Sequence, residues 1–230
     1  MRAALEWHQP ELKGAPQAPL FLVTIWPIVL LPRSWHNLRE NHPRPGFAMR
    51  FASSLVLVAA LLAAPALAAE DAETGLAVTL PDTFVVEAVA SPPPYNVTFG
   101  VKSASDEPAT LTGEKYLCQV SFQSVPGNEG LRLEKINEQI GSPSWVAMAK
   151  DGMSSIFDFV SDASFELHGY KGHEFIGKPK QKNAEHVRLV LSMVETAKGR
   201  TAISCVTEAD RLDTVLPTFH AIRDGVTPPV

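Results

Sequence analysis

The pattern that most constrains the fold is a pair of strand-like stretches near the C-terminus, joined by a tight turn. In the first stretch, EHVRLVLSMVETA (residues 185–197), apolar side chains occupy alternate positions, which are Val187, Leu189, Leu191 and Met193. Lys198, Gly199 and Arg200 form the predicted turn, and TAISCVTE (201–208) is the predicted returning strand. A parallel pair needs a crossover of about a dozen residues or more, so this spacing predicts an antiparallel hairpin.

Further short stretches have the same strand character. They are GLAVTLP (75–81), TFVVEAVA (83–90), YNVTFGV (95–101), YLCQVSFQ (116–123), SFELHGY (164–170) and HEFIGKP (173–179). We predict turns at Gly172 and around residues 180–183. Consecutive strands with such short connections extend the antiparallel sheet.

Helical spacing appears in the middle of the chain and at its end. LRLEKINEQI (131–140) places Leu133, Ile136 and Ile140 on one side, and Ser142 followed by Pro143 predicts the start of a second helix. A third helix is predicted after Thr207 as its N-cap, and its apolar stripe consists of Leu212, Val215, Leu216, Phe219 and Ile222.

Strands with helices in two separate places predict the α+β class. We expect one domain over residues 75–224, an antiparallel β-sheet flanked by helices, with the C-terminal helix packed on the sheet. Residues 69–74 are predicted to be a loose tail, and residues 225–230 a second tail.

The stretch MRFASSLVLVAALLAAPALAAE (49–70) has the features of a secretory signal peptide. Arg50 supplies the charged start, residues 55–64 form an uncharged apolar core, and Ala66-Leu67-Ala68 has small residues two positions apart. The core is shorter than the roughly 20 apolar residues of a membrane span. We predict a signal peptide over residues 49–68, cleaved after Ala68 or Ala69, and hence a periplasmic or alternatively a secreted protein without a membrane anchor after cleavage.

Residues 1–48 precede the predicted signal peptide, which would ordinarily stand at the start of a chain. Their apolar stretch, residues 18–32, is interrupted by Pro27 and closed by Pro32. A first membrane span and a transit peptide are two readings of this segment, although transit peptides are rich in serine and poor in acidic residues. We favour a third, in which translation starts at Met49 and residues 1–48 are a non-native upstream extension.

Charge argues against two classes of partner. Without residues 1–68, the chain of 230 residues is reduced to 162, with 14 basic and 22 acidic side chains and a formal net charge of −8 instead of −5. Such an acidic body offers no electrostatic footprint for nucleic acid or an anionic membrane. We therefore expect a protein partner of unknown identity.

Both cysteines, Cys118 and Cys205, lie in the exported part. Two cysteines in an exported domain are a candidate disulfide, with two buried free thiols as the alternative. If the strand faces that carry them both point at the core, the two sulfurs can approach each other beneath a helix.

A metal site is the more specific alternative to a pure interaction protein. His168 and His173 flank the predicted turn at Gly172, Glu174 is adjacent, and His186 lies on a neighbouring strand. Imidazoles with a carboxylate suit zinc or copper, but the spacing matches no ligand pattern, and strand alternation turns at least one of these side chains away. We assign no metal or cofactor site.

The sequence contains no motif for nucleophilic hydrolysis. There is no G-x-S-x-G elbow, both cysteines lie in apolar strands, and Asp158 and Asp162 fit ordinary surface charge near a helix end. We therefore assign no catalytic residue and expect a protein that is not an enzyme, with an atypical hydrolase as the remote alternative.

Several segments together resemble the PsbP/Mog1-like superfamily. They are GLAVTLPDTF, SWVAMAKDGM, GYKGHEFIG and LDTVLPTFHAI, and the resemblance spans residues 74–224. It implies a non-enzymatic binding or assembly module with an antiparallel sheet between helices, as in exported bacterial members of unknown function. It transfers no site residue. The expected function is that of an exported accessory protein, with small-ligand or metal binding as the alternative.

Overall fold

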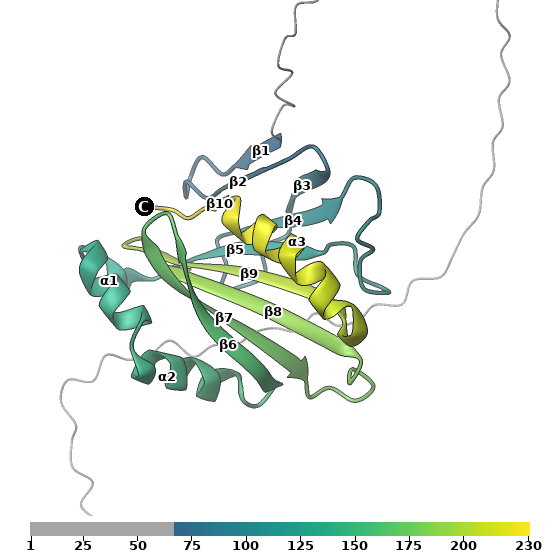
Figure 1. Cartoon of the computed structure of the whole chain (residues 1–230). Coiled ribbons are helices and arrows are strands. Elements are labelled where there is room, and N and C mark those ends of the chain that lie inside the picture. Colours follow the sequence, from purple (N-terminus) through teal and green to yellow (C-terminus); the bar gives the residue numbers. More distant parts are fainter. Residues whose placement is uncertain (1–66) are drawn as a thin grey trace, which may run out of the picture.

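The computed structural model describes residues 67–230 (Figure 1). Three α-helices accompany ten strands in this part of the chain. The helices are α1 (Leu133–Ile140), α2 (Pro143–Met153) and α3 (Leu212–Asp224), with short 3₁₀ helices η1 (Pro126–Asn128) and η2 (Ala209–Arg211). The strands are β1 (Leu67–Glu70), β2 (Ala77–Leu80), β3 (Phe84–Val89), β4 (Val97–Ser103), β5 (Cys118–Ser124), β6 (Phe157–Leu167), β7 (Tyr170–Pro179), β8 (Val187–Glu195), β9 (Gly199–Glu208) and β10 (Val226–Thr227).

Seven strands form the main sheet in the order β3-β4-β5-β9-β8-β7-β6, and every neighbouring pair is antiparallel. A second sheet of three short strands has the order β1-β2-β10. The predicted α+β class, the antiparallel sheet and the C-terminal helix packed on it are therefore confirmed.

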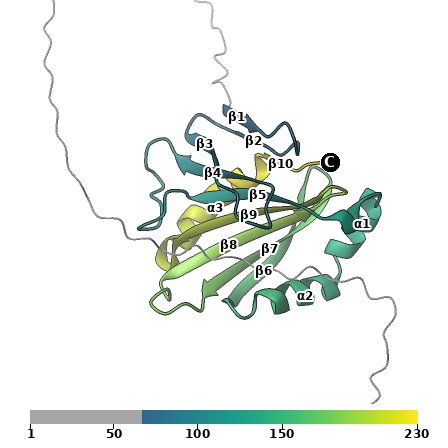
Figure 2. The same ribbon diagram turned by 180° about the vertical axis from the view of Figure 1, so that it is seen from behind.

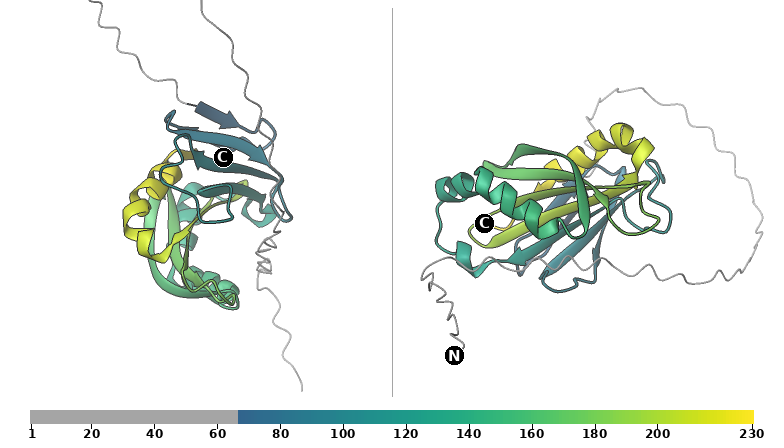
Figure 3. Two further views of the ribbon diagram at one scale, coloured as in Figure 1. Left: turned by 90° about the vertical axis from the view of Figure 1, so that its right-hand side faces the viewer. Right: turned by 90° about the horizontal axis from the view of Figure 1, so that it is seen from below.

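The helices cover opposite faces of the main sheet (Figure 3). The face under α3 belongs to a core that includes Val120, Ile203 and Phe219. The face under α1 and α2 belongs to a second core that includes Ile136, Trp145 and Phe175. Because side chains of a strand alternate between faces, each central strand contributes to both cores.

The small sheet ties down both segments that were predicted to be tails. Ala69 and Glu70 lie in β1, opposite Val78 and Ala77 of β2, instead of in a loose tail. Asp71 then accepts hydrogen bonds from the backbone N–H and the hydroxyl of Thr74, at 2.8 and 2.7 Å, so the following residues form an ordered turn. At the other end, β10 pairs with β2, and Pro228 and Pro229 are buried.

The predicted cleavage position after Ala68 falls inside β1. Cleavage there would leave Ala69 and Glu70 of this strand, which keep their partners on β2. The rest of the predicted signal peptide, and the predicted upstream extension over residues 1–48, lie outside the described residues.

Two hairpin turns differ from their predicted positions. The β6–β7 turn is formed by His168 and Gly169, both with positive φ, whereas Gly172 lies within β7 beneath the ring of Phe165. The β8–β9 turn lies one step earlier than predicted, closed by hydrogen bonds between Thr196 and Gly199. In both cases a glycine that seemed to mark a turn is required instead by the close approach of a neighbour; a Cβ on Gly199 would collide with the backbone of β5.

The predicted helix starts have mixed outcomes. The Ser142 side chain accepts from the Trp145 N–H at 3.2 Å and caps α2 as predicted. Thr207, in contrast, belongs to β9 and caps nothing, because the chain passes through η2 before α3 begins. Within residues 67–230, no helix combines the length and the apolar character that crossing a bilayer requires.

Candidate functional site

The residues singled out in the sequence meet at β7 but point to opposite sides of it. His173 and Glu174 are neighbours on this strand, and both are buried. His173 faces α2 together with Phe175, whereas Glu174 faces α3. Strand alternation therefore separates the two, as predicted for at least one of the candidate ligands.

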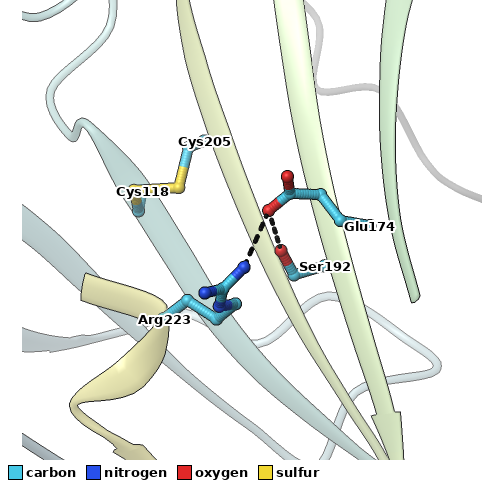
Figure 4. The surroundings of a disulfide bond; sticks show 5 residues. All are labelled: Cys118, Glu174, Ser192, Cys205 and Arg223. Carbon is cyan, nitrogen blue, oxygen red and sulfur yellow. Dashed lines mark hydrogen bonds and ion pairs between the residues drawn. A yellow bond between two sulfur atoms is a disulfide. The ribbon is translucent and has the colours of Figure 1, made fainter. Parts of the chain in front are cut away.

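Glu174 is the centre of a buried polar cluster beneath α3 (Figure 4). The Ser192 hydroxyl donates to its Oε2 at 2.9 Å, and the Arg223 Nη1 lies 3.3 Å from the same oxygen. The His220 Nε2 lies 3.0 Å from Oε1. Arg223 also stacks on the Phe165 ring, with its guanidinium carbon 4.5 Å from the ring centroid. Because His220 and Arg223 both contact Glu174, this one carboxylate connects the sheet to the last turns of α3.

The Cys118–Cys205 pair lies next to this cluster (Figure 4). The two residues are register partners on β5 and β9, and their sulfurs are at bonding distance, 2.10 Å. Both side chains are almost completely buried in the core under α3. The expected approach of the two sulfurs beneath a helix is thus what the structure contains.

A second polar cluster lies on the α2 face. Asp162 of β6 is ion-paired with Lys150 of α2, and its Oδ2 lies 3.0 Å from the His173 Nε2. The imidazole is enclosed by Trp145 and Phe175, with ring centroids at 6.3 and 4.8 Å. The Lys150 ammonium, and secondly the His173 imidazole, hold the pKa of Asp162 below its ordinary value.

The other two histidines lie elsewhere. His168, in the β6–β7 turn, has its Nε2 3.0 Å from the Val226 carbonyl oxygen of β10. His186 precedes β8, and its nearest carboxylate, Glu208, is 3.8 Å away. Among residues 67–230, no three histidine, cysteine or carboxylate side chains are grouped so that they could hold a metal ion. The structure therefore does not bring His168, His173, Glu174 and His186 together as one set of ligands.

The Glu174 cluster contains serine, histidine and carboxylate, but in the wrong order for catalysis. A catalytic triad has the histidine between the serine and the acid. Here Ser192 and His220 both contact the carboxylate, and Ser192 is only 3% exposed. The arrangement suits attachment of a helix and not attack on a substrate.

The sequence reasoning missed a third buried cluster, at the β8–β9 hairpin. Arg200 donates to the Glu195 carboxylate, which also accepts from Asn128 Nδ2 at 2.6 Å. Asn128 belongs to η1, so the pair fixes this loop to the hairpin. A signal was available: with the turn at residues 197 and 198, Glu195 and Arg200 are direct cross-strand partners.

A partly exposed ion cluster fixes the loop before β5. Glu87 of β3 accepts from Lys102 of β4, from Lys115 at 2.7 Å and from the Tyr116 hydroxyl at 3.0 Å. These three donors lower the pKa of Glu87 to about 2. The Tyr116 ring then covers Gly100, where a Cβ would collide with it.

The surface beside α1 carries a hollow of about 310 Å³, lined by Leu131, Lys135, Glu138, Gln139 and Ser142. It is open to solvent, and two of its lining side chains, Lys135 and Glu138, are ion-paired with each other at 2.6 Å. Sites for small molecules usually enclose most of the ligand, and this hollow does not.

The free edge of the main sheet is the other feature that the sequence did not indicate. β6 is the last strand of the sheet, is 11 residues long and carries a bulge between Phe159 and Ser161. Residues 160–164 are all exposed, and Val160 is 59% exposed. An unpaired strand of this length is a ready template for another strand.

Comparison of the chain with family models and with curated protein sequences gives no match. Among solved structures, it is similar to cyanobacterial PsbP (CyanoP) from Synechocystis sp. PCC 6803, with 12% identity, 72% of this chain and 93% of that chain covered, and a TM-score of 0.46. It is also similar to PA94 from Pseudomonas aeruginosa, a protein of unknown function, with 10% identity, coverage of 72% and 98%, and a TM-score of 0.39. We transfer neither a partner nor a site residue from these two proteins.

Proposed function

We propose that the protein is an exported, non-catalytic binding or assembly protein of the periplasm. The observation that carries this proposal is the buried Cys118–Cys205 pair at disulfide distance in the core. Disulfides persist in oxidising compartments such as the periplasm and are rare in the cytosol. The signal-like stretch over residues 49–68 supports the same compartment independently.

The use of the polar side chains supports a non-catalytic role. Glu174, Asp162 and Glu195 each connect a helix or a loop to the sheet through hydrogen bonds and ion pairs. An enzyme needs a nucleophile or base with access to a substrate, whereas Glu174 and Glu195 are buried between the elements that they connect, and the more exposed Asp162 is paired with Lys150. The interaction role then falls to the exposed surface.

In-cell crosslinking with and without the leader tests the proposal. Cells would produce the chain from Met49 onward, which begins with the predicted export signal, and, as the matched control, a chain starting at Met followed by Ala69, which lacks it. We expect the chain from Met49 to be found in the periplasmic fraction and to crosslink reproducibly to a protein there, and the control to stay in the cytosol without that product. Retention of both chains in the cytosol would contradict the proposal.

A further inference from the structure

We propose that the free edge of β6 is a docking site for an extended segment of a partner protein, with net positive charge and small or apolar residues at alternate positions. The inference rests on the proposed function, because it names the surface and the partner chemistry for a binding protein. The partner segment would add an eighth strand to the main sheet, a mode in which backbone hydrogen bonds give affinity and alternate side chains give specificity.

The two edges of the sheet differ in what covers them. β3, at one edge, has six residues and lies beside β1 of the small sheet (Figure 1). β6, at the other edge, has 11 residues, and within residues 67–230 its backbone pairs with β7 alone (Figure 2). The unpaired backbone groups of β6 therefore face outward along most of the strand.

The two faces of this edge present different side chains. Asp162, Ser164 and Glu166 are register partners of Phe175, His173 and Lys171, and so lie on the α2 face. On the α3 face, Ser161 and Ala163 are exposed, and Phe165 is half-buried against Arg223. A partner strand would meet carboxylates on one face, and small residues and an aromatic ring on the other.

Charge selects the partner. β6 contains Asp158, Asp162 and Glu166 but no basic residue. Asp162 is paired with Lys150, and Asp158 lies 3.3 Å from Lys180, whereas Glu166 lies opposite Lys171 in the β6–β7 register but makes no ion pair among the described residues. A lysine or arginine opposite Glu166 would be a favourable cross-strand pair, and the formal net charge of −8 on residues 69–230 would attract a cationic segment.

The same charges disfavour a second copy of this chain as the occupant. In an antiparallel pair of two β6 strands centred on Asp162, the two Asp162 side chains would lie opposite each other. A pair centred on Val160 would likewise place Asp158 opposite Asp162. Like charges opposite each other destabilise a strand pair. The acidic residues therefore disfavour pairing of β6 with a second β6, whereas they allow pairing with a basic segment.

Binding of a defined peptide to the purified, oxidised chain from Ala69 onward tests the inference. The probe is an eight-residue peptide of alternating lysine and valine, blocked at both ends, and the matched control peptide has glutamate in place of lysine. Observed by NMR, the lysine peptide should shift the amide signals of residues 158–166 and slow their hydrogen exchange, and leave β3 unchanged. The glutamate peptide should have no effect.

Substitutions at the two edges complete the test. Ala163→Lys places a cation on the β6 edge and should weaken binding by about tenfold or more, whereas Ala88→Lys, at an exposed alanine of the β3 edge, should leave binding unchanged. Equal binding of both peptides, shifts outside β6, or concentration-dependent dimerisation through β6 without peptide would overturn the inference. Because purified protein is used, this result is independent of the crosslinking result. A periplasmic partner that binds another surface would contradict the docking site and leave the proposed function intact.

Discussion

Both faces of the main sheet pack apolar side chains against their helices, but the polar contacts of the two faces differ in burial. Beneath α3, the buried carboxylate of Glu174 binds donors from β8 and α3, and the Cys118–Cys205 pair crosslinks the sheet alongside it. Beneath α2, apolar and aromatic packing around Trp145 dominates, and the ion pair between Lys150 and Asp162 lies at the rim. The difference predicts that replacing the paired polar side chains lowers the free energy of unfolding strongly on the α3 face and only slightly on the α2 face.

The largest effect should come from the crosslink itself. Replacing both Cys118 and Cys205 by alanine should lower the free energy of unfolding by about 4–5 kcal/mol, because a covalent link across a sequence separation of 87 residues restricts the unfolded chain. Urea unfolding of the variant and of the oxidised parent measures this difference. The reduced parent is the control and should resemble the variant; a loss below about 1 kcal/mol would show that the pair adds little to stability.

The next largest effect should come from removing one charge of the buried Glu174–Arg223 ion pair, compared with removing both. Arg223→Met removes one partner and leaves the Glu174 charge buried, which should cost about 3 kcal/mol of unfolding free energy. The double variant Glu174→Leu with Arg223→Met removes both charges and should recover most of that loss. Equal destabilisation by the single and the double variant would mean that Arg223 acts through its stacking on Phe165 and not through the ion pair.

One buried side chain on the α3 face, Thr201, should lower the stability of the fold. Thr201 is completely buried, and its hydroxyl has no hydrogen-bond partner among the described residues. Thr201→Val replaces this hydroxyl with a methyl group and should raise the free energy of unfolding by about 1 kcal/mol. The same change at Thr98, whose hydroxyl is 3.1 Å from the Ser121 hydroxyl, is the control and should be destabilising; a loss of stability in Thr201→Val would point to a hydrogen bond that the hydroxyl makes.

The matching ion pair on the α2 face should contribute much less. Lys150 and Asp162 are each about one-third exposed, so Lys150→Met should change the free energy of unfolding by no more than about 1 kcal/mol. Thermal or urea unfolding beside Arg223→Met compares the two faces directly. A loss as large as that of Arg223→Met would abolish the proposed distinction between them.

The smallest effect concerns acid titration on the α2 face. Lys150 and His173 lower the pKa of Asp162 below 3.8, so the associated stability is present above the ordinary carboxyl pKa and is lost as the pH falls through the lowered value. NMR titration of the Asp162 carboxyl should give a midpoint below 3.8 that rises in Lys150→Met. A midpoint unchanged by the substitution would show that the lysine does not set this pKa.

Much of the fold was predictable because it follows from periodicity. The β8–β9 hairpin, the Ser142 cap of α2 and the apolar stripe of α3 depend on residues near one another in the sequence. The errors at Gly172 and Gly199 arose because a glycine marks either a turn or a close approach, and only the packing of Phe165 or of β5 decides between them.

The candidate sites were less predictable because they depend on contacts that are distant in the sequence. Glu174 meets residues 46 and 49 positions away, at His220 and Arg223, and no local pattern connects them. The free edge of β6 follows from strand order, which periodicity leaves open. The approach of Cys118 and Cys205 could be predicted only on the condition that the strand faces carrying them both point at the core.

Intact mass and thiol labelling of the protein taken from the periplasm test the central claim, that this is an exported domain locked by a buried disulfide. The account predicts a chain that begins at Ala69 or Glu70, is lighter than its reduced form by two hydrogens, and takes up no thiol reagent when unfolded without reductant. A chain confined to the cytosol that takes up reagent at both Cys118 and Cys205 would contradict it.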